Sequence, residues 1–169
     1  MTSIVLVGFM GSGKTTVAKA LQTQSNLPLV DMDQLIINSQ GQSISELFER
    51  YGESGFRRIE TACLRDCLQT SSIISTGGGV VLSSENRQLL NKSTSHIIWL
   101  KAEFETMYQR IIADKKNVRP IVVQRTKQEL EKIENDRRAL YEDVATFIVE
   151  VDRLSVNQIV NQIKRNIID

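Results

Sequence analysis

The chain has 169 residues, of which 41% are hydrophobic and 24% charged, so it is long enough to bury one sizeable core. Its formal net charge of +1 leaves no overall field to attract nucleic acid or an anionic membrane, and a small-molecule partner is expected. No apolar stretch reaches the roughly 18 residues of a membrane helix, and the N-terminus does not resemble a signal peptide. A cytoplasmic protein is therefore expected.

The predicted elements alternate between strands and helices. Short apolar runs predict strands at 3–7, 27–30, 72–75, 95–100 and 145–151. Amphipathic segments predict helices at 14–25, 33–39, 43–51, 54–69, 83–91, 103–112, 126–142 and 155–167. This alternation predicts an α/β fold with about five parallel strands and helices on both faces. Both prolines, Pro28 and Pro120, are expected to lie outside helices.

The first predicted strand leads directly into a glycine-rich segment. Residues 8–15 match the template G-x-x-x-x-G-K-[ST], and a helix-like segment follows, which is the context that the motif requires. Glycines allow backbone N–H groups to point at phosphate oxygens, and the helix N-terminus adds positive charge there. The motif predicts a nucleoside triphosphate site, with Lys14 reaching the β- and γ-phosphates and the Thr15 hydroxyl completing the shell of Mg²⁺.

Two carboxylates, Asp31 and Asp33, follow the second predicted strand. The carboxyl ends of strands in an open α/β sheet face the ligand crevice, so both side chains are expected near the bound phosphates. One could hold Mg²⁺ through water, and the other could orient or deprotonate an acceptor hydroxyl. Helix capping is the alternative, and the same residue can cap a helix and serve the site.

Two further clusters are candidates for binding an acceptor. Arg57 and Arg58 lie at the start of a predicted helix, where a planar guanidinium suits an anionic substrate; an exposed basic face is the alternative. Gly77, Gly78 and Gly79 follow the third predicted strand and leave its end without side chains. Backbone amides can therefore approach a ligand closely there, with a plain flexible turn as the alternative.

Residues 113–124 are polar, basic and interrupted by a proline between two helix-like segments. A connection of this length in a compact kinase-like domain is often a mobile lid. Cys63 and Cys67 lie four apart on one predicted helix, without a second cysteine pair or a nearby histidine to complete a metal site. They are expected to be reduced, partly buried thiols, with a redox switch as the alternative, and His96 is expected to be structural.

Together these motifs resemble the shikimate kinase family over essentially the whole chain. The family pattern has the phosphate loop, Asp-x-Asp after the second strand, Phe-Arg in the substrate helix and Gly-Gly-Gly after the third strand. It continues with Arg-Pro in the lid and Arg-x-x-x-Tyr near the end. The matching segments here are 8–15, 31–33, 56–57, 77–79, 119–120 and 137–141. Each motif after the phosphate loop is weak alone, but six in order form a strong pattern.

The resemblance implies a P-loop NTPase-type three-layer sandwich. It implies a single P-loop kinase domain over residues 1–169, with substrate-binding helices at about 33–62 and a lid at about 112–125. The implied reaction transfers the γ-phosphoryl group of ATP to the 3-hydroxyl of shikimate, a step toward chorismate and the aromatic amino acids, with Mg²⁺ as cofactor. ATP and shikimate are the implied partners.

The resemblance also implies residue roles. Asp33, Lys14 and Arg119 would be catalytic, with Asp33 the candidate general base and Arg119 carried to the phosphoryl group by the lid. Asp31 and Thr15 would support the metal. Shikimate would be bound by Asp33, Arg57, Gly77, Gly78, Gly79 and Arg137, of which the two arginines clamp its carboxylate. ATP would be bound by Gly11, Ser12, Gly13, Lys14, Thr15, Thr16, Arg110, Arg119 and Arg153.

Three choices remain open at this point. Arg137 is preferred to its neighbour Arg138 because it stands four residues before Tyr141. Another small-metabolite kinase, such as a gluconate kinase, is the alternative within the same architecture. A GTP-dependent switch is the alternative from another class, but such proteins read guanine with Asn-Lys-x-Asp, and the sequence after Asn91 and Lys92 lacks the aspartate. A monomer is expected because no apolar stripe is left unassigned.

Overall fold

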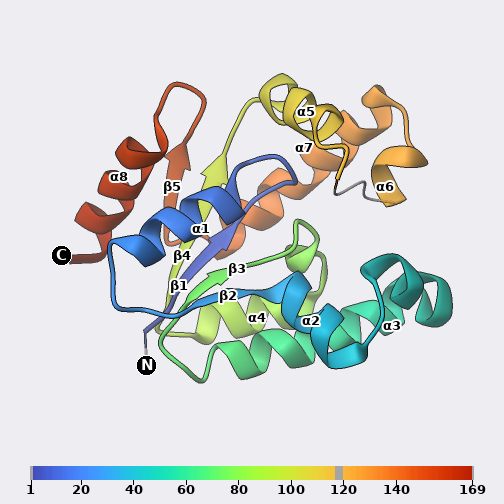
Figure 1. Cartoon of the computed structure of the whole chain (residues 1–169), viewed down its shortest axis with the longest axis horizontal. Coiled ribbons are helices and arrows are strands. Elements are labelled where there is room, and N and C mark those ends of the chain that lie inside the picture. Colours follow the sequence, from blue (N-terminus) through green and yellow to red (C-terminus); the bar gives the residue numbers. More distant parts are fainter. Residues whose placement is uncertain (1, 117–119, 169) are drawn as a thin grey trace.

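The structure, a computed structural model, describes residues 2–116 and 120–168. One sheet of five parallel strands lies at its centre, in the order β2-β3-β1-β4-β5 (Figure 1). The strands are β1 (Ile4–Val7), β2 (Leu29–Asp31), β3 (Ile73–Ser75), β4 (His96–Lys101) and β5 (Phe147–Glu150). The predicted α/β class with parallel strands is confirmed.

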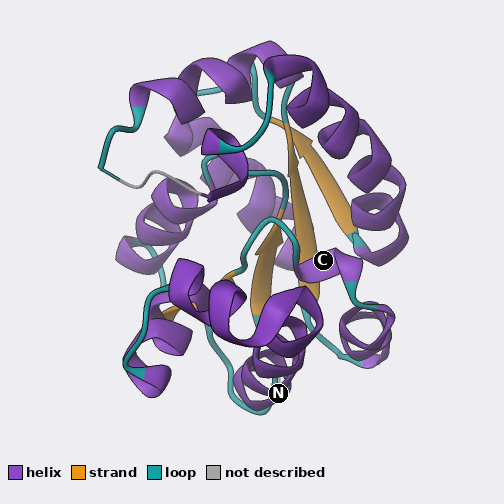
Figure 2. Ribbon diagram, turned by 90° about the vertical axis from the view of Figure 1, so that its right-hand side faces the viewer, coloured by secondary structure: helices purple, strands orange, loops and turns teal. Residues whose placement is uncertain are grey.

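Helices cover both faces of the sheet (Figure 2). Helices α1 (Lys14–Thr23) and α8 (Val156–Ile168) contact each other on one face. The other face is covered by α3 (Ile44–Cys67), α4 (Ser84–Lys92) and α7 (Lys127–Val144). The remaining elements are α2 (Met32–Gln40), the short 3-10 helix η1 (Val80–Leu82), α5 (Phe104–Ala113) and α6 (Pro120–Val123).

Strand β1 occupies the middle of the sheet, and all four of its residues are buried. A strand covered on both faces needs apolar side chains in both directions, which explains a continuous apolar run in place of an alternating one. Val5 lies opposite Ile74 of β3 on one side and Ile97 of β4 on the other. The phosphate loop and the glycine segment 77–79 therefore leave the sheet from neighbouring strands, at the same edge.

The helices predicted at 43–51 and 54–69 form the two halves of α3, which is kinked at Gly52. A capping box begins this helix, because the Ser43 side chain accepts a hydrogen bond from the Glu46 backbone and the Glu46 carboxylate accepts from the Ser43 backbone. Gly52 has φ of 67° and ψ of −179°, which is non-helical and in the region that favours glycine. The kink redirects the chain just before Arg57.

Two short helices were not predicted. The expectation that Pro120 lies outside a helix is wrong, because α6 begins at this residue. Proline fits the first helical position, where its missing N–H would have no helical partner anyway. The turn η1 has no periodicity to reveal it, since it is only three residues long. Arg119, assigned to the lid, lies outside the described residues.

Three smaller observations complete the fold. Cys63 and Cys67 carry free thiols, the first half-buried and the second buried. His96 begins β4, and its backbone N–H donates a hydrogen bond to the carbonyl of Ser3. Within the described part of the chain, every helix is too short or too polar to span a bilayer.

Candidate active site

The phosphate loop wraps around the side chain of Lys14. Lys14 is only 8% exposed, and its Nζ donates hydrogen bonds to the carbonyl oxygens of Gly8 at 2.7 Å and Phe9 at 3.0 Å. Gly11, with φ of 77°, lies so close to α5 that a Cβ there would be 2.7 Å from the carbonyl oxygen of Met107. The glycine therefore lets the loop pack closely against α5.

The predicted hydroxyl and backbone contacts to ATP gather at this loop. Ser12 is buried, and its Oγ has no hydrogen-bond partner among the residues that the structure describes. Gly13 immediately precedes α1, whose first turn presents the exposed side chains of Thr15 and Thr16. A helix N-terminus with unpaired amides and hydroxyls is a site for phosphate.

Arg110 of α5 lies beside the loop. Its Nη1 donates a hydrogen bond to the carbonyl oxygen of Gly11 at 3.1 Å. An open cavity of about 470 Å³ adjoins this contact and is lined by Met10, Gly11, Gly13, Thr16, Arg110, Ile111, Ile112, Asp114, Lys115 and Val122. The space is mixed apolar and polar, which suits a heteroaromatic ring with a charged tail. Arg153, by contrast, is exposed in the turn after β5.

The two aspartates after β2 take different positions. Asp31 caps α2, because its Oδ1 accepts a hydrogen bond from the backbone N–H of Gln34 at 3.2 Å. Asp33 lies in the first turn of α2 and points toward the glycine segment, so that a Cβ on Gly77 would be 3.0 Å from its Oδ1. Asp33 therefore lies beside the glycines expected to meet the acceptor, and Asp31 lies at the end of the strand.

Arg57 and Arg58, adjacent in the sequence, are separated in space. The Arg57 side chain is 16% exposed, whereas Arg58 is exposed to solvent. Arg57 stacks over Phe56, with its guanidinium carbon 5.3 Å from the ring centroid. Its Nη1 donates to the Glu60 carboxylate at 2.8 Å, while its Nε is buried without an acceptor within the described residues. The guanidinium therefore pairs with Glu60 through Nη1, while its Nε has no acceptor among the described residues.

Glu60 is a site residue that the sequence interpretation missed. It is 2% exposed and lies between Arg57 and the glycine segment, with its Oε2 at 3.5 Å from the Cβ that Gly77 would carry. Burial raises the pKa of Glu60 above its ordinary value of 4.5, and the nearby Asp33 adds to this rise. The guanidinium of Arg57 opposes it. From the sequence, a glutamate in an amphipathic helix is expected to have a solvent-exposed side chain. Only the spacing of three residues from Arg57 indicated that the two side chains could form an ion pair.

Arg137 and Arg138 also diverge. Arg138 is half-buried and donates from Nε to both carboxylate oxygens of Glu134, at 2.8 and 3.0 Å. Arg137 is 8% exposed and lies over the ring of Phe9, 5.6 Å from the centroid. Its Nη1 would be 3.7 Å from a Cβ on Gly78, and its Nε has no acceptor in the part of the chain described. Arg137 is thus the arginine that faces the glycine segment.

Tyr141 fixes the glycine segment from the same helix. Its hydroxyl, fully buried, donates a hydrogen bond to the carbonyl oxygen of Gly78, 63 residues earlier in the chain. Burial raises the pKa of this hydroxyl, so it stays protonated and remains a donor. This bond ties the middle of the glycine segment to α7.

The structure therefore brings two groups of residues to one edge of the sheet. The phosphate loop with Lys14 lies at the end of β1, and Asp33, Arg57 and Arg137 surround the glycines at the end of β3. In this sheet the central strand leads through a phosphate loop into a helix, and a second group of binding residues lies beside the loop. These two features together define the class of P-loop kinases.

Comparison with known proteins narrows this class. The model of the family described as shikimate kinase matches residues 10–168. A shikimate kinase of Enterococcus faecalis is 39% identical over 163 residues, covering 96% of each chain. One from Streptococcus thermophilus is 43% identical, covering 95% of this chain and 97% of its own. The chain belongs to the shikimate kinase family, whose members are ATP-dependent phosphotransferases acting on a hydroxyl group.

Solved structures agree with this assignment. A shikimate kinase from Acinetobacter baumannii in complex with shikimate superimposes with a TM-score of 0.89 at 29% identity, covering 99% of this chain and 93% of its own. A gluconokinase from Sinorhizobium meliloti, at 16% identity and a TM-score of 0.61, shares the fold alone.

Proposed function

We propose that this chain transfers the γ-phosphoryl group of ATP to the 3-hydroxyl of shikimate, yielding shikimate 3-phosphate and ADP. The observation that carries the proposal is the pair of poorly exposed arginines, Arg57 and Arg137, on either side of the glycine segment. Each has an Nε that finds no acceptor among the described residues. A buried guanidinium with a missing acceptor fits an anionic ligand, and shikimate carries one carboxylate. The Acinetobacter relative, solved with shikimate, supports the same substrate.

On the acceptor side, we assign Arg57 and Arg137 to the carboxylate, because two planar forks from different helices fix both its position and its orientation. Gly77, Gly78 and Gly79 would offer backbone N–H groups to the substrate. Asp33 would hold the reacting hydroxyl in line with ATP and accept its proton as the bond to phosphorus forms.

On the donor side, the loop amides and the N-terminus of α1 would hold the β- and γ-phosphates, with Gly11, Ser12, Gly13, Thr15 and Thr16 contributing. Lys14 would exchange its carbonyl partners for phosphate oxygens and follow the charge that develops during transfer. Arg110 and Arg153 are assigned to the adenine end. Arg119 is assigned to the phosphoryl group, carried there by a lid over residues 112–125.

Mg²⁺ is the ion proposed to accompany ATP. The Thr15 hydroxyl is exposed at the start of α1, and the Asp31 carboxylate accepts one hydrogen bond from Gln34, which leaves further lone pairs. This donor set fits Mg²⁺, which takes oxygen ligands and usually only one or two from the protein, beside phosphate and water. When bound by Thr15 and Asp31, the ion would neutralise phosphate charge.

The same proposal treats residues 1–169 as a single kinase domain, with substrate-binding helices over about 33–62, acting as a cytoplasmic monomer. These statements follow the family pattern and the modest net charge of the chain.

The experiment is a coupled assay of ADP release from ATP and Mg²⁺, with shikimate, gluconate and nucleoside monophosphates compared as acceptors. Shikimate alone is expected to stimulate release. Protein that binds ATP but shows no shikimate-dependent ADP would refute the proposal, and stimulation by gluconate would redirect it to the other kinase of this architecture. Size-exclusion chromatography with light scattering checks the monomer.

A further inference from the structure

Asn86 is a fully buried amide on α4, outside the set of residues assigned to either substrate. Its Nδ2 donates one hydrogen bond to the carbonyl oxygen of Val80 at 2.9 Å and another to Oε1 of Glu60 at 3.4 Å. The Val80 carbonyl can only accept, so the amide must present its nitrogen to it. One side chain thereby joins the turn after the glycine segment to the carboxylate that holds Arg57.

The opposite end of the same amide is unsatisfied. Asn86 Oδ1 is buried and has no hydrogen-bond partner within residues 2–116 and 120–168. A buried acceptor without a partner costs stability, and an apolar side chain of similar volume would avoid that cost. The two donated bonds, rather than the filling of space, are therefore what this residue contributes.

The neighbouring residue supports the same turn without reaching the carboxylate. Arg87 Nη1 donates to the carbonyl oxygens of Val81 at 2.7 Å and Leu82 at 3.3 Å. Both residues thus hold η1, but only Asn86 also contacts Glu60. Arg87 can therefore contribute only to the folding of η1, whereas Asn86 can also fix the position of the Glu60 carboxylate.

We propose that Asn86 is a positioning residue for acceptor binding, acting through the Glu60 carboxylate on the guanidinium of Arg57. The inference rests on the proposed phosphorylation of shikimate. Glu60 Oε1 accepts from both Arg57 and Asn86, so the amide fixes the carboxylate against the glycine turn and the carboxylate in turn fixes the guanidinium. Without the amide, the buried carboxylate can rotate, and the arginine loses its set direction toward the substrate.

The first test is Asn86→Leu, with Asn86→Ala as a second variant that also removes the amide donor and adds no charge beside Glu60. Loss of one hydrogen bond to a buried charged group predicts a KM for shikimate raised by about three- to tenfold, while the KM for ATP stays within about twofold. Should the leucine variant fail to fold, the alanine variant decides. A shikimate KM equal to that of the unmodified protein in a folded variant, or equal rises in both KM values, overturns the inference.

Ser83→Ala is the matched control for destabilising α4. The Ser83 side chain caps this helix by accepting a hydrogen bond from the backbone N–H of Asn86 at 3.3 Å. Its removal is expected to lower the melting temperature by a few degrees and to leave both KM values unchanged. If Ser83→Ala raises the shikimate KM as Asn86→Leu does, the effect is structural and the inference fails.

A double-mutant cycle tests the route through the acid. If Asn86 acts only by fixing Glu60, then adding Asn86→Leu to Glu60→Gln should raise the shikimate KM little further. Additive effects of the two substitutions contradict the route. Absence of shikimate-dependent ADP release in the unmodified protein would instead remove the proposed function itself, so the two failures are distinct.

Discussion

The guanidinium group of Arg57 fills the space that a side chain at Gly79 would need. A Cβ built on Gly79 would lie 2.8 Å from Arg57 Nη1, closer than such atoms can approach. The backbone conformation of Gly79, with φ of −94°, is open to any residue, so the contact with Arg57 is the reason that a side chain here matters: an added Cβ would force the guanidinium to move.

Gly79→Ala is expected to displace Arg57 and weaken the acceptor side selectively. We expect the shikimate KM to rise on the order of tenfold to a hundredfold, with little change for ATP, because a misplacement near 1 Å is enough to disrupt a clamp. Steady-state kinetics with each substrate varied in turn measures this. Gly41→Ala is the control: its φ of 65° makes alanine strained, but no atom lies within 4 Å of the added Cβ, so stability should fall without a change in either KM.

Arg137→Lys and Arg138→Lys form a matched pair of adjacent substitutions. Lysine keeps the charge but loses the planar fork, so at position 137 the affinity for shikimate should fall about tenfold to a hundredfold. At position 138 the change affects only the pair with Glu134, and the affinity should stay within about twofold. Isothermal titration with shikimate distinguishes the two. A larger loss of shikimate affinity in Arg138→Lys than in Arg137→Lys would show that Arg138, and not Arg137, binds the carboxylate.

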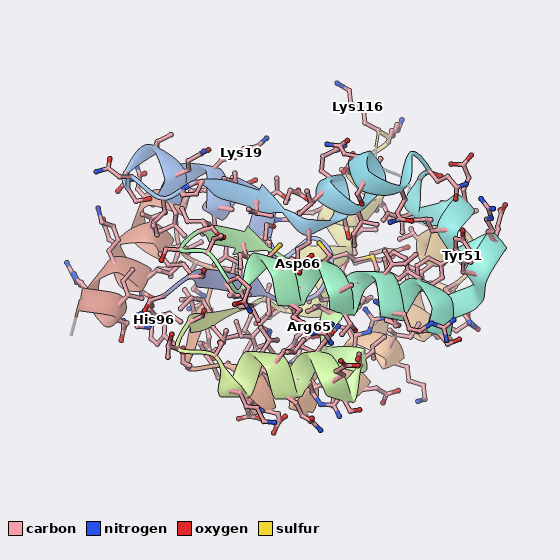
Figure 3. All side chains as sticks on the ribbon, turned by 90° about the horizontal axis from the view of Figure 1, so that it is seen from below. Lys19, Tyr51, Arg65, Asp66, His96 and Lys116 are labelled. Carbon is pink, nitrogen blue, oxygen red and sulfur yellow. The ribbon has the colours of Figure 1, made fainter. Side chains whose placement is uncertain are left out.

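Lys14→Ala should lower kcat on the order of a hundredfold or more, because it removes the charge directed at the transferring phosphoryl group. The control is Lys19→Ala in the same helix, whose side chain projects into solvent (Figure 3) and should leave kcat unchanged. Both variants are compared by single-turnover ADP formation at saturating substrates. Normal turnover in Lys14→Ala would contradict the assignment of the phosphate loop.

Glu60 predicts a particular pH dependence of stability. Burial raises its folded pKa above the ordinary 4.5, so the folded protein binds this proton more tightly than the unfolded chain does. The stabilisation from this group is therefore fully present below pH 4.5 and is lost as the pH rises through the raised pKa. Relative to Glu60→Gln, which resembles the protonated form, the unmodified protein should gain melting temperature as the pH falls from about 8 toward about 5. A difference that moves in the opposite direction would show that Arg57 outweighs burial.

Features that depend on short sequence segments could be predicted. The phosphate loop is encoded locally by its glycines and Lys14, and the short apolar run before it predicts the buried strand that the structure shows as β1. The choice of Arg137 over Arg138 came from a spacing of four to Tyr141. In the structure Arg137 and Tyr141 both face the glycine segment from one side of α7, because residues four apart lie on the same face of a helix.

Features that depend on tertiary contacts could not be predicted. Glu60 and Asn86 look like ordinary residues of amphipathic helices, and each becomes part of the site only because α3 and α4 pack beside η1. Helix α6 has four residues, too few for any periodicity to appear. The kink at Gly52 was visible as a gap between two predicted helices, but its φ and ψ values were not.

The hydrogen bond from Tyr141 to Gly78 has a consequence for how the molecule is made. The phosphate loop emerges from the ribosome before α7 does, because it lies earlier in the chain. Because a domain generally folds as a unit, the acceptor side cannot be completed until α7 has emerged. A nascent or truncated chain that ends before Tyr141 lacks both this anchor and Arg137, and so has no closed place for a second substrate.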